Sequence, residues 1–222
     1  MRKIPNRQQA ERRAHGLARA DGFSLIELTI AMALVLIMMA GASRLLMTSL
    51  GVRTRESQKS DALADAQRAL NIMSREIGNS GFGMNYNGLV ETDCHPTTAA
   101  DPVTAQIRLR ANVNNANGTI SDSDEDVTFL YKGAQTRAII RYDDVTKQST
   151  VLAGEIDAMQ ITYINAAGGE STLATPTAVR EAERVRVTIQ VNLQATVGQP
   201  ASQVLLTSEI ALRNAPGVIN NY

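Results

Sequence analysis

The sequence predicts an α+β protein in which a long N-terminal α-helix packs on an antiparallel β-sheet domain. Residues 28–43 contain no charged side chain, and helix-type spacing of apolar residues continues as far as Gly78. After Gly81 the apolar residues instead alternate with polar ones, which is the period of a half-buried strand. The change of period predicts a helix first and a sheet second.

The first half of the predicted helix is apolar enough to cross a membrane. From Phe23 the sequence runs for roughly 30 Å of helix, at about 1.5 Å per residue, with Glu27 as its one charge before Arg44. Arg44 is placed to extend toward the far interface. Six basic residues precede this span, and four lie in the 17 residues after it. This bias favours a cytoplasmic N-terminus.

The second half of the helix is amphipathic. An apolar stripe follows spacings of three and four residues, with charged side chains elsewhere, and it consists of Leu63, Ala66, Leu70, Met73 and Ile77. No Pro or Gly interrupts Arg53 to Ile77, and Gly78 is a plausible stop. We therefore expect one continuous helix of about 54 residues, whose stripe packs against the following domain.

Six segments of the remaining chain are predicted to be strands. They are residues 107–111, 127–132, 137–142, 156–164, 183–194 and 203–213, each bounded by Gly, Asn, Asp or Pro. In the fifth segment Val185, Val187, Ile189 and Val191 alternate with polar residues. We expect this apolar face to receive the helix stripe, since an antiparallel sheet is often covered on one side only.

Charge separates the N-terminus from the rest of the chain. Residues 1–22 hold six basic and two acidic side chains, and residues 23–222 hold 16 basic and 20 acidic ones. A basic N-terminal segment before an acidic remainder indicates a targeting segment. The acidic remainder argues against a general nucleic-acid-binding protein. We thus divide the chain into a basic leader (1–22), a transmembrane helix (23–50), its amphipathic continuation (51–78) and a β-rich domain (79–222).

The junction between leader and span carries the most specific motif. It reads Gly22-Phe23-Ser24-Leu25-Ile26-Glu27-Leu28, and it resembles the processing site of type IV prepilins and type II secretion pseudopilins. The resemblance implies that a membrane-embedded prepilin peptidase cleaves between Gly22 and Phe23 and methylates the new amine of Phe23. It also implies that Glu27 acts in filament assembly, which would explain an acidic residue just inside a membrane span.

Weaker similarities extend further. Residues 66–77 with Gly81-Phe82, and the closing Arg213-Asn214, resemble minor pilins of the PilW kind. Major pilins usually carry a Pro where Arg44 stands, and many close a C-terminal loop with paired cysteines. These departures favour a minor pilin that initiates or caps a type IV pilus. A minor pseudopilin of a type II secretion system is the alternative, and a tip adhesin or DNA-uptake subunit is a further one.

This resemblance implies a location and a set of partners. The protein is expected in the inner membrane as a single-pass protein with a periplasmic C-terminal domain, and then in a pilus or pseudopilus. The expected partners are the prepilin peptidase and methyltransferase, other minor pilins, the major pilin and the inner-membrane assembly platform.

An ordinary secretory signal is the competing interpretation. Ala40-Gly41-Ala42 has the small-x-small form of a signal-peptidase site, which would leave a chain starting at Ser43. The long basic segment, Glu27 at the apolar edge and the helical pattern past the proposed cut argue against it.

Catalysis and metal binding have little support. Cys94 and His95 are adjacent without an evident third group, so we expect no enzyme, and Cys94 is either a lone thiol or pairs with another chain. A degenerate calcium loop places Asn115, Asn117 and Asp124 near ligand positions, but a polar hairpin loop with an Asn-Gly turn is the favoured interpretation. We expect no other cofactor.

Two arginine pairs share a strand face. Arg108 with Arg110, and Arg184 with Arg186, recur at a spacing of two residues, which suits either a solvated sheet face or a nucleic-acid contact. The acidic body of the chain favours the solvated face.

Overall fold

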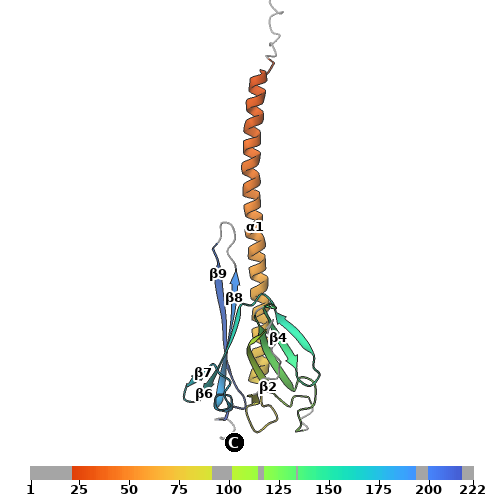
Figure 1. Ribbon diagram of the computed structural model, residues 1–222, viewed down its shortest axis with the longest axis vertical. Helices are drawn as coiled ribbons and strands as arrows, with labels where there is room; N and C mark the ends of the chain where they lie inside the picture. Colours follow the sequence, from red (N-terminus) through yellow and green to blue (C-terminus); the bar gives the residue numbers. More distant parts are fainter. Residues whose placement is uncertain (1–21, 92–101, 115–117, 134, 194–199, 217–222) are drawn as a thin grey trace, which may run out of the picture. The chain divides into compact units, whose positions relative to one another are not determined.

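The computed structural model describes residues 22–91, 102–114, 118–133, 135–193 and 200–216 (Figure 1). Its first element is α1, Leu25–Gly78, a single helix of 54 residues. The chain divides into two compact units, residues 1–51 and 52–222, each described separately here. The predicted α+β class with a long N-terminal helix on antiparallel sheets is confirmed.

Residues 52–222 build two antiparallel sheets. The first has the order β1-β2-β3-β4-β5, with β1 Leu89–Val90, β2 Val103–Arg110, β3 Asp126–Lys132, β4 Ala138–Asp143 and β5 Ser149–Ala153. The second has the order β7-β6-β8-β9, with β6 Ala158–Asn165, β7 Glu170–Ser171, β8 Ala182–Leu193 and β9 Ser202–Ala211. A short helix, α2 Pro176–Arg180, connects β7 to β8.

The six predicted strands are present, and four elements were missed for physical reasons. β1 and β7 have two residues each, too few to show a period. β5 lacks clean alternation because a register shift between Ile139 and Ile140 of β4 leaves Leu152 and Ala153 both buried. In α2, the Thr175 hydroxyl accepts the N–H of Ala178 and Pro176 stands in the first turn, a local start signal.

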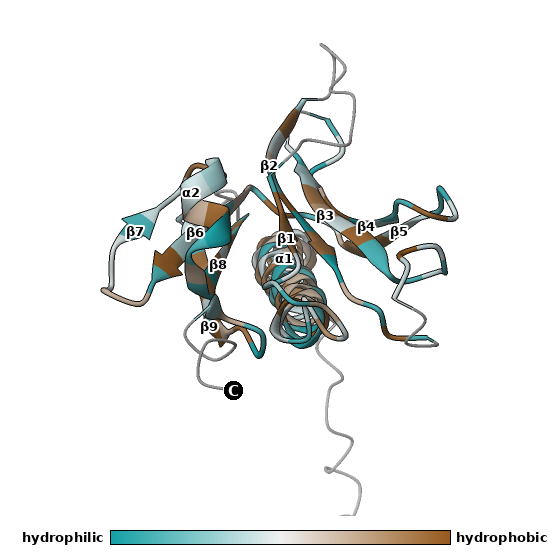
Figure 2. Cartoon of the chain, turned by 90° about the horizontal axis from the view of Figure 1, so that it is seen from below, coloured by the Kyte–Doolittle hydropathy of each residue, from teal (hydrophilic) through white to brown (hydrophobic). Residues whose placement is uncertain are grey.

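The C-terminal part of α1 lies between the two sheets, seen end-on in Figure 2. Four residues of the predicted stripe, Ala66, Leu70, Met73 and Ile77, are buried, whereas Leu63 is only partly covered. Ala62 and Ala69 are also buried. These two small side chains lie beside the predicted stripe, so the buried face of α1 is wider than the stripe itself.

The inner faces of the two sheets supply the rest of one core. The predicted β8 face of Val185, Val187, Ile189 and Val191 is fully buried and shares a cluster with the α1 stripe. From the first sheet, buried side chains such as Phe129 and Ile139 join the same cluster. The helix therefore covers the apolar faces of both sheets. The sequence had predicted only one sheet.

Polar contacts fix α1 against each sheet. The hydroxyls of Ser74 and Ser208 on β9 lie 3.1 Å apart. On the other side, Nε of Arg141 on β4 donates to the carboxylate of Glu76 at 3.0 Å. Burial raises the pKa of Glu76 in spite of the opposing effect of Arg141. This ion pair therefore specifies the position of the helix more than it stabilises the fold.

The segment after α1 returns to the first sheet through a close crossing. The N–H of Gly81 donates to the carbonyl of Arg110 at 2.8 Å, and the N–H of Arg110 donates to the carbonyl of Gly88 at 2.7 Å. Gly88 has a φ of 75°, and an added Cβ would collide with the backbone nitrogen of Gly81. Glycine is required here because two backbones meet.

Burial of the α1 stripe makes a stability prediction. Leu70→Ala should lower the free energy of unfolding by about 2–5 kcal/mol, because the deleted atoms leave a cavity between helix and sheet. Denaturant melts of a soluble fragment beginning near Arg53 would measure it. Leu205→Ala is the matched control, since Leu205 is 58% exposed. Equal, small effects of both substitutions would show that the stripe does not support this core.

Candidate processing and assembly site

Three described residues, Gly22, Phe23 and Ser24, precede α1. The carbonyl of Ser24 accepts N–H groups from Glu27 at 3.0 Å and from Leu28 at 3.1 Å, which begins α1. The peptide bond between Gly22 and Phe23 therefore lies outside the helix, in the non-helical segment before Leu25. Phe23 is 82% exposed, and no atom lies within 4 Å of a Cβ built on Gly22. Among the described residues, no side chain packs over this bond.

Glu27 lies in the first turn of α1 and is exposed. The first N–H groups of a helix lack intrahelical partners and carry partial positive charge, so a carboxylate is favourable there. Within the part of the chain that the structure describes, Glu27 forms no ion pair. Its carboxylate remains available to a group on another chain.

The apolar half of α1 is exposed around its circumference. Its large exposed side chains include Leu28, Ile30, Met32, Leu34, Val35, Leu36, Ile37, Met38 and Met39. Among the described helices, α1 is the one long and apolar enough to cross a bilayer, and its most apolar window is not buried at all. A helix that is apolar on all sides belongs in lipid or in a larger apolar assembly. It fits a single-pass membrane anchor.

Polar groups in this segment are compatible with lipid. The hydroxyls of Thr29 and Thr48 donate to the carbonyls of Ile26 and Arg44, so each is satisfied within the helix. Glu27 and Arg44 are separated by about 26 Å along the axis, at about 1.5 Å per residue. This distance is close to the roughly 30 Å of a hydrocarbon core, which places the two charges near its opposite faces.

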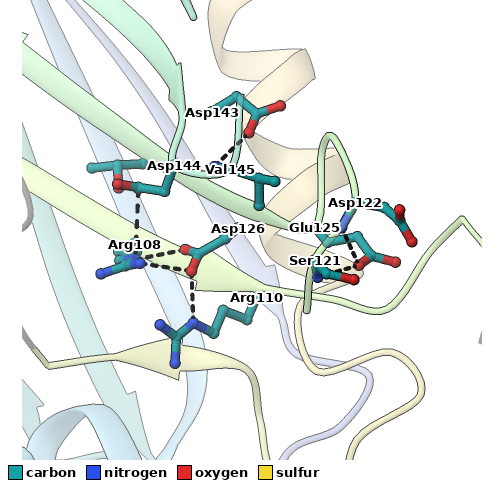
Figure 3. Close-up of polar contacts among 10 residues, drawn as sticks. Arg108, Arg110, Ser121, Asp122, Glu125, Asp126, Asp143, Asp144 and Val145 are labelled. Carbon is teal, nitrogen blue, oxygen red and sulfur yellow. Dashed lines mark hydrogen bonds and ion pairs between the residues drawn. The ribbon is translucent and has the colours of Figure 1, made fainter. Parts of the chain in front are cut away.

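The first arginine pair is neutralised within the chain. Arg108 donates two hydrogen bonds of 2.6 Å to Asp126, and Arg110 donates a third of 2.9 Å (Figure 3). Asp144 lies 3.6 Å from the Arg108 guanidinium. Burial by itself raises the pKa of Asp126, but hydrogen bonds and charge from the two arginines outweigh burial and lower the pKa below its ordinary value.

The second pair is also engaged with carboxylates. Arg184 donates to Glu209 at 2.5 Å, and Arg186 reaches both Glu209 and Glu170. The hydrogen bond from Arg186 is the main cause that lowers the pKa of Glu209. Both arginine pairs are therefore balanced by carboxylates. The predicted solvated face describes Arg184 and Arg186, whereas the Arg108 side chain is only 14% exposed, so the prediction is wrong for Arg108.

The acidic loop before β3 is organised by backbone donors. Glu125 is fully buried, and its carboxylate accepts N–H groups from Ser121 and Asp122 at 3.1 Å (Figure 3). Asp143 likewise accepts the N–H groups of Asp124, Val145 and Thr146. Such bonds favour the charged form, and despite burial they lower the pKa of Asp143.

The structure describes only one of the three residues predicted to bind calcium, Asp124. Asn115 and Asn117 lie outside the described residues. The Asp124 carboxylate accepts a 2.7 Å hydrogen bond from Arg141, so a cation at Asp124 would have to displace this guanidinium. No group of three or more His, Cys, Asp or Glu side chains gathers within the described ranges. Calcium binding stays a prediction.

The pockets of the described residues contain no recognisable set of catalytic side chains. One hollow, of about 550 Å³, lies between β1 and α2 and is lined by Asn87, Glu91, Val179 and Arg180 among others. The amide of Asn87 is committed to structure, donating to the carbonyls of Val179, Arg180 and Ala182. Cys94 and His95 lie outside the described residues.

Sequence reasoning missed the roles of the buried acids. Glu125 and Asp126 directly follow Asp124, which was considered for metal binding, and the structure uses them to hold backbone amides and arginines. The signal was present in the strand register, since Arg110 of β2 stands opposite Asp126 of β3. Finding it required the pairing of the two strands, which the composition of each strand does not specify.

Comparison with known proteins identifies the N-terminal segment. Residues 17–43 match the family model described as the prokaryotic N-terminal methylation motif. The match includes Gly22, Phe23 and Glu27, and it supports a type IV pilin-like or pseudopilin protein, whose relatives are structural subunits and not enzymes. No curated protein matches the chain.

The arginine–aspartate cluster predicts a loss of stability in acid. The folded-state pKa of Asp126 lies below its unfolded value, so its contribution is present above about pH 4 and disappears as the pH falls through the folded pKa. Asp126→Asn should lower the free energy of unfolding at pH 7 by about 1–3 kcal/mol and weaken the acid dependence.

Denaturant melts between pH 2 and pH 7 provide the measurement. Glu155→Gln is the control, because the Glu155 side chain is 75% exposed in its pair with Arg137. If Asp126→Asn and wild type lost stability in parallel as the pH falls, Asp126 would not be the titrating group.

Proposed function

We propose that this chain is a minor pilin, a structural subunit that initiates or caps a type IV pilus. The observation that carries the proposal is the accessible Gly22–Phe23 bond directly before an exposed apolar helix, within the matched methylation motif. The β-rich domain on the second half of α1 supplies the part that remains outside the membrane. A subunit of this design is anchored first and is then drawn into a filament through its helix.

Two features favour a minor subunit over the bulk fibre protein. Arg44 places a charge within the apolar surface of α1, and every copy of a bulk subunit would have to accommodate that charge in the filament interior. The chain has one cysteine, Cys94, so it cannot close a C-terminal loop by an internal disulfide. Among minor pilins, the residues at the end of α1 favour the PilW kind.

The proposed partners follow from the order of events. The prepilin peptidase acts first at Gly22, the inner-membrane assembly platform extracts the processed chain, and other minor pilins and the major pilin surround α1. The proposed orientation has a cytoplasmic N-terminus and a periplasmic domain. The charge-balanced arginine faces favour protein neighbours over nucleic acid.

A minor pseudopilin of a type II secretion system is the alternative, because both systems use the same N-terminal motif. A deletion strain distinguishes them. Loss of surface pili with normal exoprotein secretion supports the pilus, and loss of secretion with intact pili supports the pseudopilus. A strain unaffected in both would contradict either role.

The processing step makes a direct prediction. The mature chain should begin at an N-methylated Phe23, as measured by mass spectrometry of the purified N-terminus. Gly22→Val should leave the full-length chain in the membrane, because the peptidase must bring the backbone at this position close to its catalytic groups. A wild-type chain that starts at Ser43 would establish a secretory signal instead.

Glu27 makes a second prediction. Cleavage creates an α-amino group on Phe23, which is cationic near neutral pH and can pair with Glu27 of a neighbouring subunit. Removing one partner of such a pair away from water costs about 3–5 kcal/mol. Glu27→Ala should therefore be processed normally and reach the membrane at the wild-type level, yet be absent from sheared filaments.

Glu27→Gln is the matched control, since it keeps the shape of the side chain and removes the charge. Both variants should fail in assembly if charge is what matters. Normal recovery of both in sheared filaments would limit Glu27 to a favourable helix-end charge.

A further inference from the structure

The two sheets end in four edges, and one edge differs from the others. β1 and β7 have two residues each, and β5 has five with a register shift beside it. β9 has ten residues, SQVLLTSEIA, without Lys, Arg or Pro. Its one charge, Glu209, is already paired with Arg184 and Arg186. Proteins usually shorten, charge or kink their edge strands to prevent pairing, and β9 has none of these protections.

The backbone of β9 offers its outer edge to a partner. The N–H of Leu212 donates to the carbonyl of Glu183 at 2.9 Å, which fixes the residues whose backbone faces β8. By the alternation of an antiparallel ladder, the backbone groups of Gln203, Leu205 and Thr207 face away from β8. No strand pairs with this side of β9 within the described residues.

β5 presents a complementary edge on the first sheet. The N–H of Asp143 donates to the carbonyl of Gln148 at 2.9 Å, so the same alternation turns the backbone of Ser149 and Val151 away from β4. Val151 is 61% exposed and Leu205 is 58% exposed. Each edge thus carries one large aliphatic side chain in water.

Contacts with α1 give the direction of both strands. Arg55 donates to the carbonyl of Pro200, just before β9, and Ser74 contacts Ser208 farther along. β9 therefore runs in the same direction as α1.

β4 also runs with α1, because Arg137 lines a groove with Arg55 whereas Arg141 contacts Glu76. β5 is antiparallel to β4 and so runs opposite to α1. Gly154, directly after β5, lines the same groove as Arg55, which places the end of β5 and the start of β9 at one level along the helix.

We propose that β9 of one copy pairs with β5 of a second copy, with Leu205 opposite Val151 and Thr207 opposite Ser149. In two copies whose α1 segments of residues 52–78 run in the same direction, these two edges meet as antiparallel strands at the same level along the helix. Two β9 edges would have to pair in parallel, which is less stable per residue. The inference rests on the membrane anchoring in the proposed function but on no particular filament system.

In this pairing, the buried faces of the two joined sheets lie on the same side, and so do their exposed faces. β5 and β9 lie on different sides of α1 in Figure 2, and both sheets turn their buried faces to that helix. The joined sheet therefore carries both helices on one face, and Leu205 and Val151 form an aliphatic cross-strand pair on the other. Each copy uses each edge once, so the contact is head-to-tail and allows further copies to add.

Cysteine crosslinking in native membranes tests the pairing with the full chain. In a Cys94→Ser background, one tagged chain carries Leu205→Cys and a differently tagged chain carries Val151→Cys. Mild oxidation should give the mixed dimer at a yield at least tenfold above that of each variant expressed alone. Replacing Val151→Cys by Gln160→Cys is the matched control, because Gln160 is exposed on β6, outside both edges that are proposed to pair.

A second variant tests the backbone hydrogen bonds. Thr207→Pro on the Leu205→Cys chain removes an N–H that faces the open edge and leaves the hydrogen bonds to β8 intact. It should therefore reduce the yield of mixed dimer at least fivefold. The melting temperature of the purified chain should fall by no more than a few degrees. Equal yields with Val151→Cys and Gln160→Cys would overturn the proposal. So would Leu205→Cys homodimers in place of mixed dimers, or an unchanged yield with Thr207→Pro. Normal processing at Phe23 in the same membranes separates these outcomes from a failure of the proposed function.

Discussion

The burial of the C-terminal part of α1 between two sheets is the interaction on which the rest of the domain depends. Both sheets turn an apolar face to the helix. Leu70, Met73 and Ile77 share one buried cluster with residues of both sheets. At about 25 cal/mol per Å² of buried apolar area, this shared cover is what stabilises either sheet. The same helix continues into the apolar segment, so the anchor and the core belong to one element.

Charge is used in two different ways along the chain. In the domain, most buried or half-buried acids have defined partners, such as Asp126 with two arginines and Glu125 with two backbone amides. On the apolar half of α1, Glu27 and Arg44 are exposed and about 26 Å apart. Paired charges specify the position of strands and loops, whereas Glu27 and Arg44 form no ion pair among the described residues and stay available to groups outside the chain.

The sequence predicted the elements with long and regular periods, and the structure explains why the others were missed. The extent of α1 follows from an uncharged run, an unbroken stripe and Gly78, all of which are local signals. The division of the strands into two sheets depends on non-local pairing, such as β6 with β8 across α2, which no single strand encodes. For the candidate site, Gly22, Phe23 and Glu27 were readable because they form a contiguous motif. The partner of Asp126 was not, because Arg108 and Arg110 lie in another strand.

Two surfaces of the described chain remain unsatisfied in water, and they require different remedies. The apolar surface of α1 needs only removal from water, so lipid or any apolar helix bundle suffices. The outer edge of β9 needs hydrogen-bond partners in the spacing of an extended strand, which neither lipid nor an apolar helix provides. A membrane therefore accounts for the first surface but not for the second. β9 lies beside the part of α1 that packs in the domain core. A strand edge of another domain has the geometry that its open backbone groups require.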